Sequence, residues 1–219
     1  MTTRSVLDKE LEDIRGDLLR LSSLVEQAID RAVKALEERD VSLAQQIIDQ
    51  DEKLNELRRK IEDDCVHVLA TQQPMAGDLR IIVAALSIAM NLERMGDHAE
   101  GISKALVTDD ADAVGDLSID LAHMSRMARE MLSLAMDAHV EDDVEKAHAA
   151  AAKDDDLDTL YRRSFSDLID RMVEGDLSIS RGTYQLWAAH NLERIGDRVT
   201  NICERIEFAS TGSIHDLNP

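Results

Sequence analysis

The heptapeptide Asn191-Leu192-Glu193-Arg194-Ile195-Gly196-Asp197 repeats Asn91-Leu92-Glu93-Arg94-Met95-Gly96-Asp97 at a distance of one hundred residues, with six of the seven positions identical. Upstream the match continues at a spacing of 103, where Asp51 falls on Asp154. A repeat of this length indicates that one structural unit occurs twice in the chain. The three missing residues predict a turn between about 170 and 180, because deletions are tolerated in surface connections.

Apolar residues recur at steps of four and three along most of the chain, which is the pattern of amphipathic helices. The six predicted helices run over about 4–37, from Ile47 to Val68 and ending before Pro74, from Ile81 to Leu106, from Leu117 to Ala135, over about 141–173, and over about 178–209. No segment shows a strand pattern. The predicted fold class is therefore all-α, with two tandem three-helix bundles of long antiparallel helices.

The predicted domain organisation follows the duplication. We expect the first three-helix repeat over 4–108 and the second over 112–209, followed by a flexible tail over 210–219 that has no apolar periodicity. The segment Thr108–Gly115 is acidic and rich in small residues, and it is expected to connect the two repeats. A chain of 219 residues is long enough to bury a stable core without disulfides or other staples.

Composition and charge exclude several classes of protein. The net charge of −20 argues against a nucleic-acid partner, because phosphates require a basic surface. Cys65 and Cys203 show no metal-binding or redox spacing and are expected to be core residues. The polar N-terminus is unlike a signal peptide, and the longest apolar run, Ile81–Met90, is too short to cross a bilayer. We therefore expect a cytoplasmic protein.

Four polar pairs lie beside the apolar positions of the predicted helices, each pair separated by four residues. A spacing of four places both side chains on the same helix face, one turn apart. If neighbouring antiparallel helices share an outer face, each repeat gathers about four oxygen-bearing side chains there. The pairs are Glu93 with Asp97, Glu193 with Asp197, Asp51 with Asn55, and Asp154 with Asp158.

The heptapeptide contains two features that favour a bound cation. Carboxylates four residues apart repel each other, and a glycine inside a helix costs about 1 kcal/mol relative to alanine. A cation would offset the repulsion, and Gly96 and Gly196 would leave room for it. Carboxylate oxygens suit Mg, Ca, Mn or Fe, whereas the absence of His and Cys from the motif argues against structural zinc.

Three simpler interpretations of the same residues remain open. Arg94 and Arg194 lie inside the motifs and would neutralise the acids. The two glycines would permit close packing of helices. Acidic pairs on exposed helices are also common as a solvated face.

The duplicated Leu-Glu-Arg-Ile/Met-Gly-Asp motif and the Gln-Gln-Pro-Met-Ala-Gly-Asp-Leu-Arg segment over 72–80 resemble the PhoU family of phosphate-specific transport accessory and regulatory proteins. The resemblance covers about 5–208. It implies a non-enzymatic negative regulator of the phosphate-starvation response that also modulates phosphate uptake. The partners it implies are the ATPase subunit of the phosphate ABC transporter, the phosphate sensor histidine kinase, and a second copy in a homodimer. The membrane would be reached only through these partners.

The resemblance also implies metal binding on motifs of the type Glu/Asp-X-X-X-Asp. In this sequence those motifs fall on Glu93 and Asp97, on Glu193 and Asp197, and on Asp154 and Asp158. Asp51 matches as well, but its partner is Asn55, and an amide is a weaker ligand than a carboxylate. The second repeat lacks the Gln-Gln-Pro turn, so any role of that turn belongs to the first repeat.

Two other functions are compatible with parts of the sequence. A regulator of a different transporter would have the same fold, and the sequence does not distinguish it. A di-iron enzyme needs a Glu-X-X-His pair on each of two helices, but the pair Glu145 and His148 has no equivalent in the other repeat, where His148 maps to Gln45. The chain also contains no Gly-rich phosphate loop and no nucleophile elbow.

Overall fold

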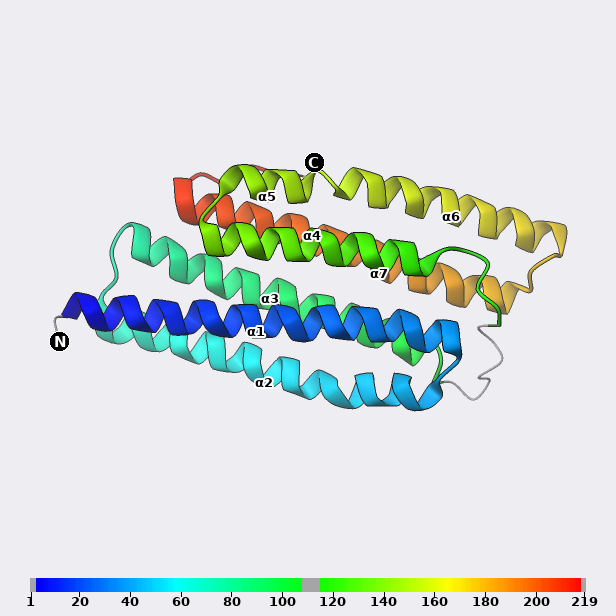
Figure 1. The fold of residues 1–219 in the computed structure, drawn as a ribbon, viewed down its shortest axis with the longest axis horizontal. Coiled ribbons are helices and arrows are strands. Elements are labelled where there is room, and N and C mark those ends of the chain that lie inside the picture. The colour runs from blue at the N-terminus through cyan, green and yellow to red at the C-terminus, as the bar shows by residue number, and fades with distance from the viewer. Residues whose placement is uncertain (1–2, 108–114, 218–219) are drawn as a thin grey trace.

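Steps of four and three between apolar residues produce long helices in the computed structural model, which describes residues 3–107 and 115–217. Within these ranges there are seven helices and no strands (Figure 1). The helices are α1 (Thr3–Glu38), α2 (Val41–Gln72), α3 (Gly77–Lys104), α4 (Leu121–Glu141), α5 (Val144–Ala151), α6 (Asp154–Glu174) and α7 (Ile179–Thr211).

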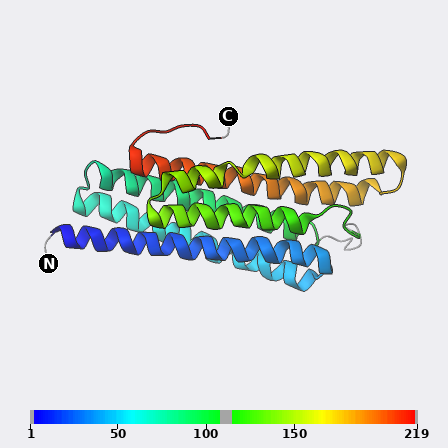
Figure 2. The same ribbon diagram turned by 45° about the horizontal axis from the view of Figure 1, so that its top comes forward.

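The two repeats form two bundles that lie side by side. Helices α1, α2 and α3 pack on one another, and α7 packs on α4, α5 and α6 (Figures 1 and 2). The most extensive contact between the bundles joins α3 to α7. Trp187 Nε1 donates to the Gly101 carbonyl at 3.2 Å, and His98 Nδ1 lies 3.0 Å from Asn191 Oδ1, so these two helices run antiparallel. The prediction of an all-α fold with tandem three-helix bundles is confirmed.

One predicted helix is divided into two in the structure. The segment expected as a single helix over 141–173 forms α5 and α6, separated at Ala152 and Lys153. Three consecutive aspartates, Asp154 to Asp156, occupy the first turn of α6. Their negative charge stabilises a helix N-terminus, where unpaired backbone N–H groups face the solvent. The charge pattern therefore supports a new helix start at this place.

The boundaries of the other helices follow local caps. Asp40, Asp120, Asp143 and Ser178 each accept a hydrogen bond from the backbone N–H three residues further on. Because Asp120 caps α4, the fourth helix begins after Leu117 and not at it. A turn occurs within the predicted range 170–180, where Gly175 ends α6 with a φ of 86°.

The core contains the apolar positions of both repeats, including the free thiols Cys65 and Cys203. None of the helices in the described ranges has a stretch that is long and apolar enough to span a bilayer. Residues 212–217 follow α7 and lie back against it, with the Leu217 N–H donating to Glu204 Oε1 at 3.1 Å. Most of the predicted connector, residues 108–114, lies outside the described ranges.

Candidate metal centres on the two repeats

The structure brings the predicted acids of each repeat together between two helices. In the second repeat, Asp154 and Asp158 of α6 face Glu193 and Asp197 of α7, and the four carboxylates lie close enough to influence one another's charge. The Thr200 hydroxyl donates to Asp154 Oδ2 at 3.3 Å. We call the set Asp154, Asp158, Glu193 and Asp197 cluster two.

The first repeat has an equivalent set with one substitution. Asp51 of α2 faces Glu93, Asp97 and Glu100 of α3. Asn55, the predicted fourth member, donates its Nδ2 to Asp51 Oδ2 at 2.8 Å. We call the set Asp51, Glu93, Asp97 and Glu100 cluster one.

Glu100 is the acid that the sequence analysis missed. It is three residues beyond Asp97 and seven beyond Glu93, a spacing that keeps all three on one helix face. Its counterpart at a distance of one hundred residues is Thr200, while Asn55 has Asp158 as its counterpart. Each cluster therefore contains four carboxylates, arranged differently.

The glycines of the heptapeptide permit close approach of the neighbouring helix. A Cβ atom on Gly196 would lie 2.5 Å from Asp154 Oδ1 and 2.7 Å from Leu157 Cδ2. On Gly96 it would lie 2.7 Å from Leu54 Cδ1. The space that the glycines were expected to leave for a cation is thus filled by Leu54 in the first repeat and by Asp154 and Leu157 in the second. The close-packing interpretation explains them, because it places Asp154 directly against α7.

The arginines of the motifs pair with the acids next to them. Arg94 Nη1 lies 3.2 Å from Asp97 Oδ2, and Arg194 Nη1 lies 2.8 Å from Asp197 Oδ2. The two arginines are about half exposed, so solvent screens both ion pairs. They neutralise part of the charge in each cluster and leave other oxygen atoms without a hydrogen bond.

Burial and repulsion from neighbouring acids raise the pKa values of Asp51 and Asp154. Burial, followed by the nearby charges of Asp197 and Asp158, raises the pKa of Asp154 to about 7. Burial, followed by Glu100 and Asp97, raises the pKa of Asp51 to about 6. Such shifts disappear when a cation binds, because an opposite charge favours the ionised form.

The donor set fits a metal ion in its chemistry. Asp51 Oδ1, Glu93 Oε2 and Glu193 Oε2 are buried and accept no hydrogen bond. In the described ranges, however, no three His, Cys, Asp or Glu side chains already stand in an arrangement that would hold an ion. A bound cation would have to draw the carboxylates inward.

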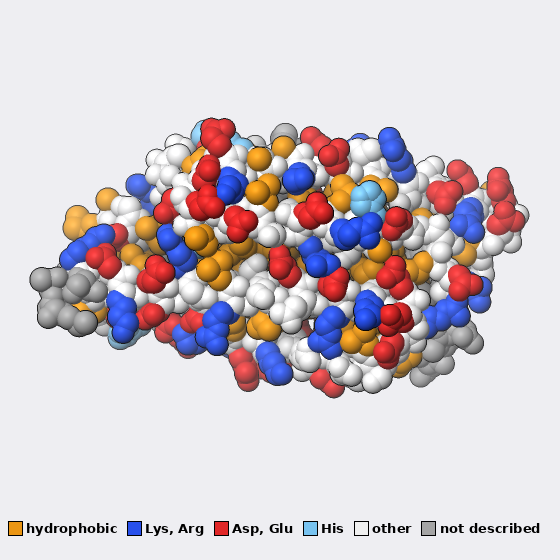
Figure 3. Space-filling model, viewed as in Figure 1, with side chains coloured by type: hydrophobic (Ala, Val, Ile, Leu, Met, Phe, Trp, Pro, Cys, Tyr) orange, Lys and Arg blue, Asp and Glu red, His pale blue; other side chains and the backbone are white. Residues whose placement is uncertain are grey.

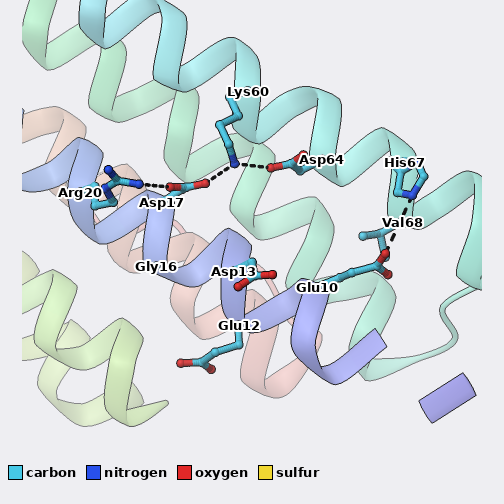
Figure 4. Close-up of a pocket in the computed structure, with 10 residues that line it drawn as sticks. All are labelled: Glu10, Glu12, Asp13, Gly16, Asp17, Arg20, Lys60, Asp64, His67 and Val68. Atoms are coloured by element: carbon cyan, nitrogen blue, oxygen red, sulfur yellow. Dashed lines mark hydrogen bonds and ion pairs between the residues drawn. The ribbon is translucent and has the colours of Figure 1, made fainter. Parts of the chain in front are cut away.

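A larger cavity lies elsewhere, between α1 and α2, and includes no predicted site residue. It has a volume of about 530 Å³ and is open to solvent (Figure 4). Its central carboxylate, Asp17, is bridged by Lys60 Nζ at 2.5 Å and by Arg20 Nη1 at 3.2 Å, and Lys60 also contacts Asp64 at 2.7 Å. Because these charges already pair with one another, the cavity is a weaker candidate than the two clusters.

On the face shown in Figure 3, basic side chains are interspersed with acidic ones and form no continuous basic surface. The pair Glu145 and His148, which has the spacing of a di-iron ligand pair, does not join either cluster. Instead, His148 Nε2 lies 3.1 Å from Glu207 Oε2.

Comparison with known proteins agrees with this architecture. The PhoU domain model matches twice, at residues 18–106 and 121–206. A phosphate-specific transport system accessory protein PhoU homolog of Clostridium acetobutylicum is 36% identical over 217 residues, which is 99% of either chain. The crystal structure of the phosphate transport system regulatory protein PhoU from Streptococcus pneumoniae has a TM-score of 0.87 and 32% identity, covering 96% of this chain and 99% of that one. PhoU from Pseudomonas aeruginosa gives the same TM-score at 33% identity, covering 94% of this chain and 99% of that one.

Proposed function

The chain belongs to the PhoU family, and from that premise we propose that it regulates phosphate transport as a negative regulator of the phosphate-starvation response. The single observation that supports this proposal is family similarity over nearly the whole chain, including both repeats. Its relatives are named as accessory and regulatory proteins and not as enzymes. Regulation then occurs by docking, with no chemical step on a substrate.

We propose two docking partners, the ATPase subunit of the phosphate ABC transporter and the cytoplasmic part of the phosphate sensor histidine kinase. Both are reached from the cytoplasm, and the protein meets the membrane only through them. A homodimer is the proposed assembly. Light scattering measures the oligomeric state directly. Binding of the protein to the immobilised ATPase subunit or kinase domain tests the docking. Failure to bind either one at micromolar concentration, with metal and nucleotide present, would contradict the docking proposal.

Deletion of the gene tests the regulatory function. A phosphate-starvation reporter in phosphate-rich medium should switch on in the deletion strain and switch off again when the gene is restored. A reporter that stays off would favour a regulator of another transporter on the same fold. Uptake assays with other transported anions would then identify that system.

Metal binding to the two clusters is the second part of the proposal. Its support is the set of buried carboxylate oxygens without hydrogen bonds and the raised pKa values of Asp51 and Asp154. When bound, a divalent or ferric ion (Fe, Mn, Mg or Ca) would neutralise the acids and hold neighbouring helices together. Asp51, Glu93 and Asp97 would hold it in cluster one, and the four members of cluster two would hold it in the second repeat.

Elemental analysis after purification without chelators tests this part. Metal content should fall when Glu193 and Asp197 are both changed to Ala. The matched control changes Asp167 and Asp170, two exposed acids on α6, to Ala and should leave metal content unchanged. Equal metal content in both double variants would remove the assignment to cluster two.

A further inference from the structure

The two acidic clusters occupy equivalent positions but have different neighbours. We propose, on the basis of the metal binding proposed above, that they bind cations unequally. Cluster two takes up a transition-metal ion first, with the His190 imidazole as an added ligand. Cluster one is weaker because the Arg58 guanidinium of the neighbouring helix already pairs with its Glu93.

In cluster one, a basic side chain from α2 approaches the acids from across the helix interface. Arg58 Nε lies 3.7 Å from Glu93 Oε1, and Arg58 Nη1 lies 2.5 Å from Glu62 Oε2. The Arg58 side chain is only 17% exposed. An ion bound by Glu93 would have to displace this guanidinium, and separating a mostly buried ion pair is costly.

Two further contacts in cluster one would also have to change. Lys104 Nζ lies 2.6 Å from Glu100 Oε2, and Asn55 Nδ2 donates to Asp51 Oδ2 at 2.8 Å. Three of the four acids are therefore held by residues other than the motif arginine. The pairs made by that arginine occur in both repeats and do not distinguish them.

In cluster two, the place of the Arg58–Glu62 pair is taken by aromatic residues. A spacing of 103 maps Arg58 to Tyr161 and Glu62 to Phe165. The two rings lie edge to face, with their centroids 6.2 Å apart. Within the described ranges, the ion pairs of Glu193 come only from α7 itself, from His190 and Arg194. No cation of α6 has to leave before a metal ion binds.

Arg198 is the additional cation near cluster two. It lies close enough to Asp197 to favour the ionised form of that carboxylate. In the part of the chain that the structure describes, it makes no ion pair within 4 Å. Its charge therefore stabilises the ionised carboxylate of Asp197, but among the described residues it forms no ion pair with an oxygen that a metal ion would bind.

His190 supplies the second difference. Its Nδ1 lies 3.5 Å from Glu193 Oε2, at the edge of cluster two. A spacing of one hundred maps His190 to Met90, so cluster one has no imidazole at this position. Imidazole ligands suit Fe, Ni, Cu and Zn, whereas carboxylates alone suit Mg, Ca and Mn. The imidazole of His98 lies near Asp97 of cluster one, but its Nδ1 is already 3.0 Å from Asn191 Oδ1 of α7, whereas His190 faces an acid of cluster two.

The test is a titration of chelator-stripped protein with Co²⁺, followed by calorimetry and by the visible absorption of the bound ion. The wild-type protein should bind one strong and one weaker equivalent. Changing Glu193 and Asp197 to Ala should remove the strong one, and changing Glu93 and Asp97 to Ala should remove the weak one. Mg²⁺ should favour cluster two by a smaller factor than Co²⁺ does, because the Arg58 difference acts on any cation whereas the His190 imidazole favours transition metals.

Two exchanges between the repeats test the cause of the inequality. His190→Met copies the first repeat and should weaken the strong equivalent by about tenfold or more and shift its absorption. Arg58→Tyr copies the second repeat and should strengthen the weak equivalent while leaving the strong one unchanged. Circular dichroism confirms that each exchange variant is folded.

The outcomes separate this inference from the proposed metal binding. Two equivalents of equal affinity would overturn the inequality. An unchanged strong equivalent in the His190→Met protein would overturn the role of His190 as a ligand. Either result would leave metal binding intact. No Co²⁺ uptake by the wild-type protein would overturn both.

Discussion

Asp154→Asn should make the stability of the metal-free protein less sensitive to pH. Asp154 is 4% exposed, and burial together with Asp197 and Asp158 raises its pKa to about 7 from an ordinary 3.8. The folded protein therefore holds this proton more strongly than the unfolded chain does. The stability that results is fully present below about pH 4 and is lost as the pH rises through about 7.

The size of the effect follows from the shift. A difference of about three pKa units at about 1.36 kcal/mol each corresponds to at most about 4 kcal/mol of unfolding free energy. Asn has nearly the same shape as Asp, cannot ionise, and offers an oxygen to the Thr200 hydroxyl. The variant should therefore lose this contribution to the pH dependence and be more stable than the wild-type protein at pH 8.

Urea unfolding followed by circular dichroism at pH 5, 6, 7 and 8, with chelator present, measures the effect. Asp167→Asn is the matched control, because Asp167 is an exposed acid on the same helix, α6. It should keep the pH dependence of the wild-type protein. If the unfolding free energy of the Asp154→Asn protein has the same pH dependence as that of the wild-type protein, burial between α6 and α7 does not raise the pKa of this carboxylate as argued.

Three further predictions concern packing, the thiols and the segment that precedes α4. Gly196→Ala should destabilise the protein by about 1–3 kcal/mol relative to Gly16→Ala, because the new Cβ atom at 196 would overlap buried side chains, whereas one at 16 would have nothing within 4 Å. Thermal unfolding of both variants measures the difference, and equal melting temperatures would contradict it. Burial raises the pKa of Cys65 and of Cys203 to about 12, so a thiol reagent at pH 8 should react with both thiols only after denaturation. Rapid labelling of the native protein would be inconsistent with their burial in the core. Gln185→Ala should cost about 1–3 kcal/mol in urea unfolding, because the Gln185 amide bonds the backbone at 116 and 118 at 2.9 and 2.8 Å; an unchanged midpoint would mean that these bonds contribute little.

Much of the fold was predictable from apolar spacing. The first helix was expected over 4–37 and is Thr3–Glu38; the sixth was expected over 178–209 and is Ile179–Thr211. Long helices with a continuous apolar seam must bury that seam against other helices, so length and periodicity are sufficient to predict helices and a bundle. The interruption at Ala152 and Lys153 was not predicted, because the alanines before it are strong helix formers and favour a continuous helix.

The candidate sites were predictable only in part. Pairs four residues apart on one helix identified Glu93 with Asp97 and Glu193 with Asp197, since neighbours on a helix are a local property. Contacts between residues of different helices cannot be recognised from residue spacing in this way. Arg58, which pairs with Glu93 from 35 positions earlier in the chain, was not predicted as part of the site.

The sequence by itself determined that the chain is a duplicated helical protein with a repeated acidic motif. These properties depend only on the spacing of residues along the chain, because residues three or four apart lie on the same face of a helix. Only the tertiary structure decided what each face meets: leucine side chains over the glycines, arginine beside cluster one, and aromatic rings and an imidazole beside cluster two. The reason is physical, because the charge balance at a buried carboxylate depends on the groups within a few ångströms, and packing brings those groups from distant parts of the chain.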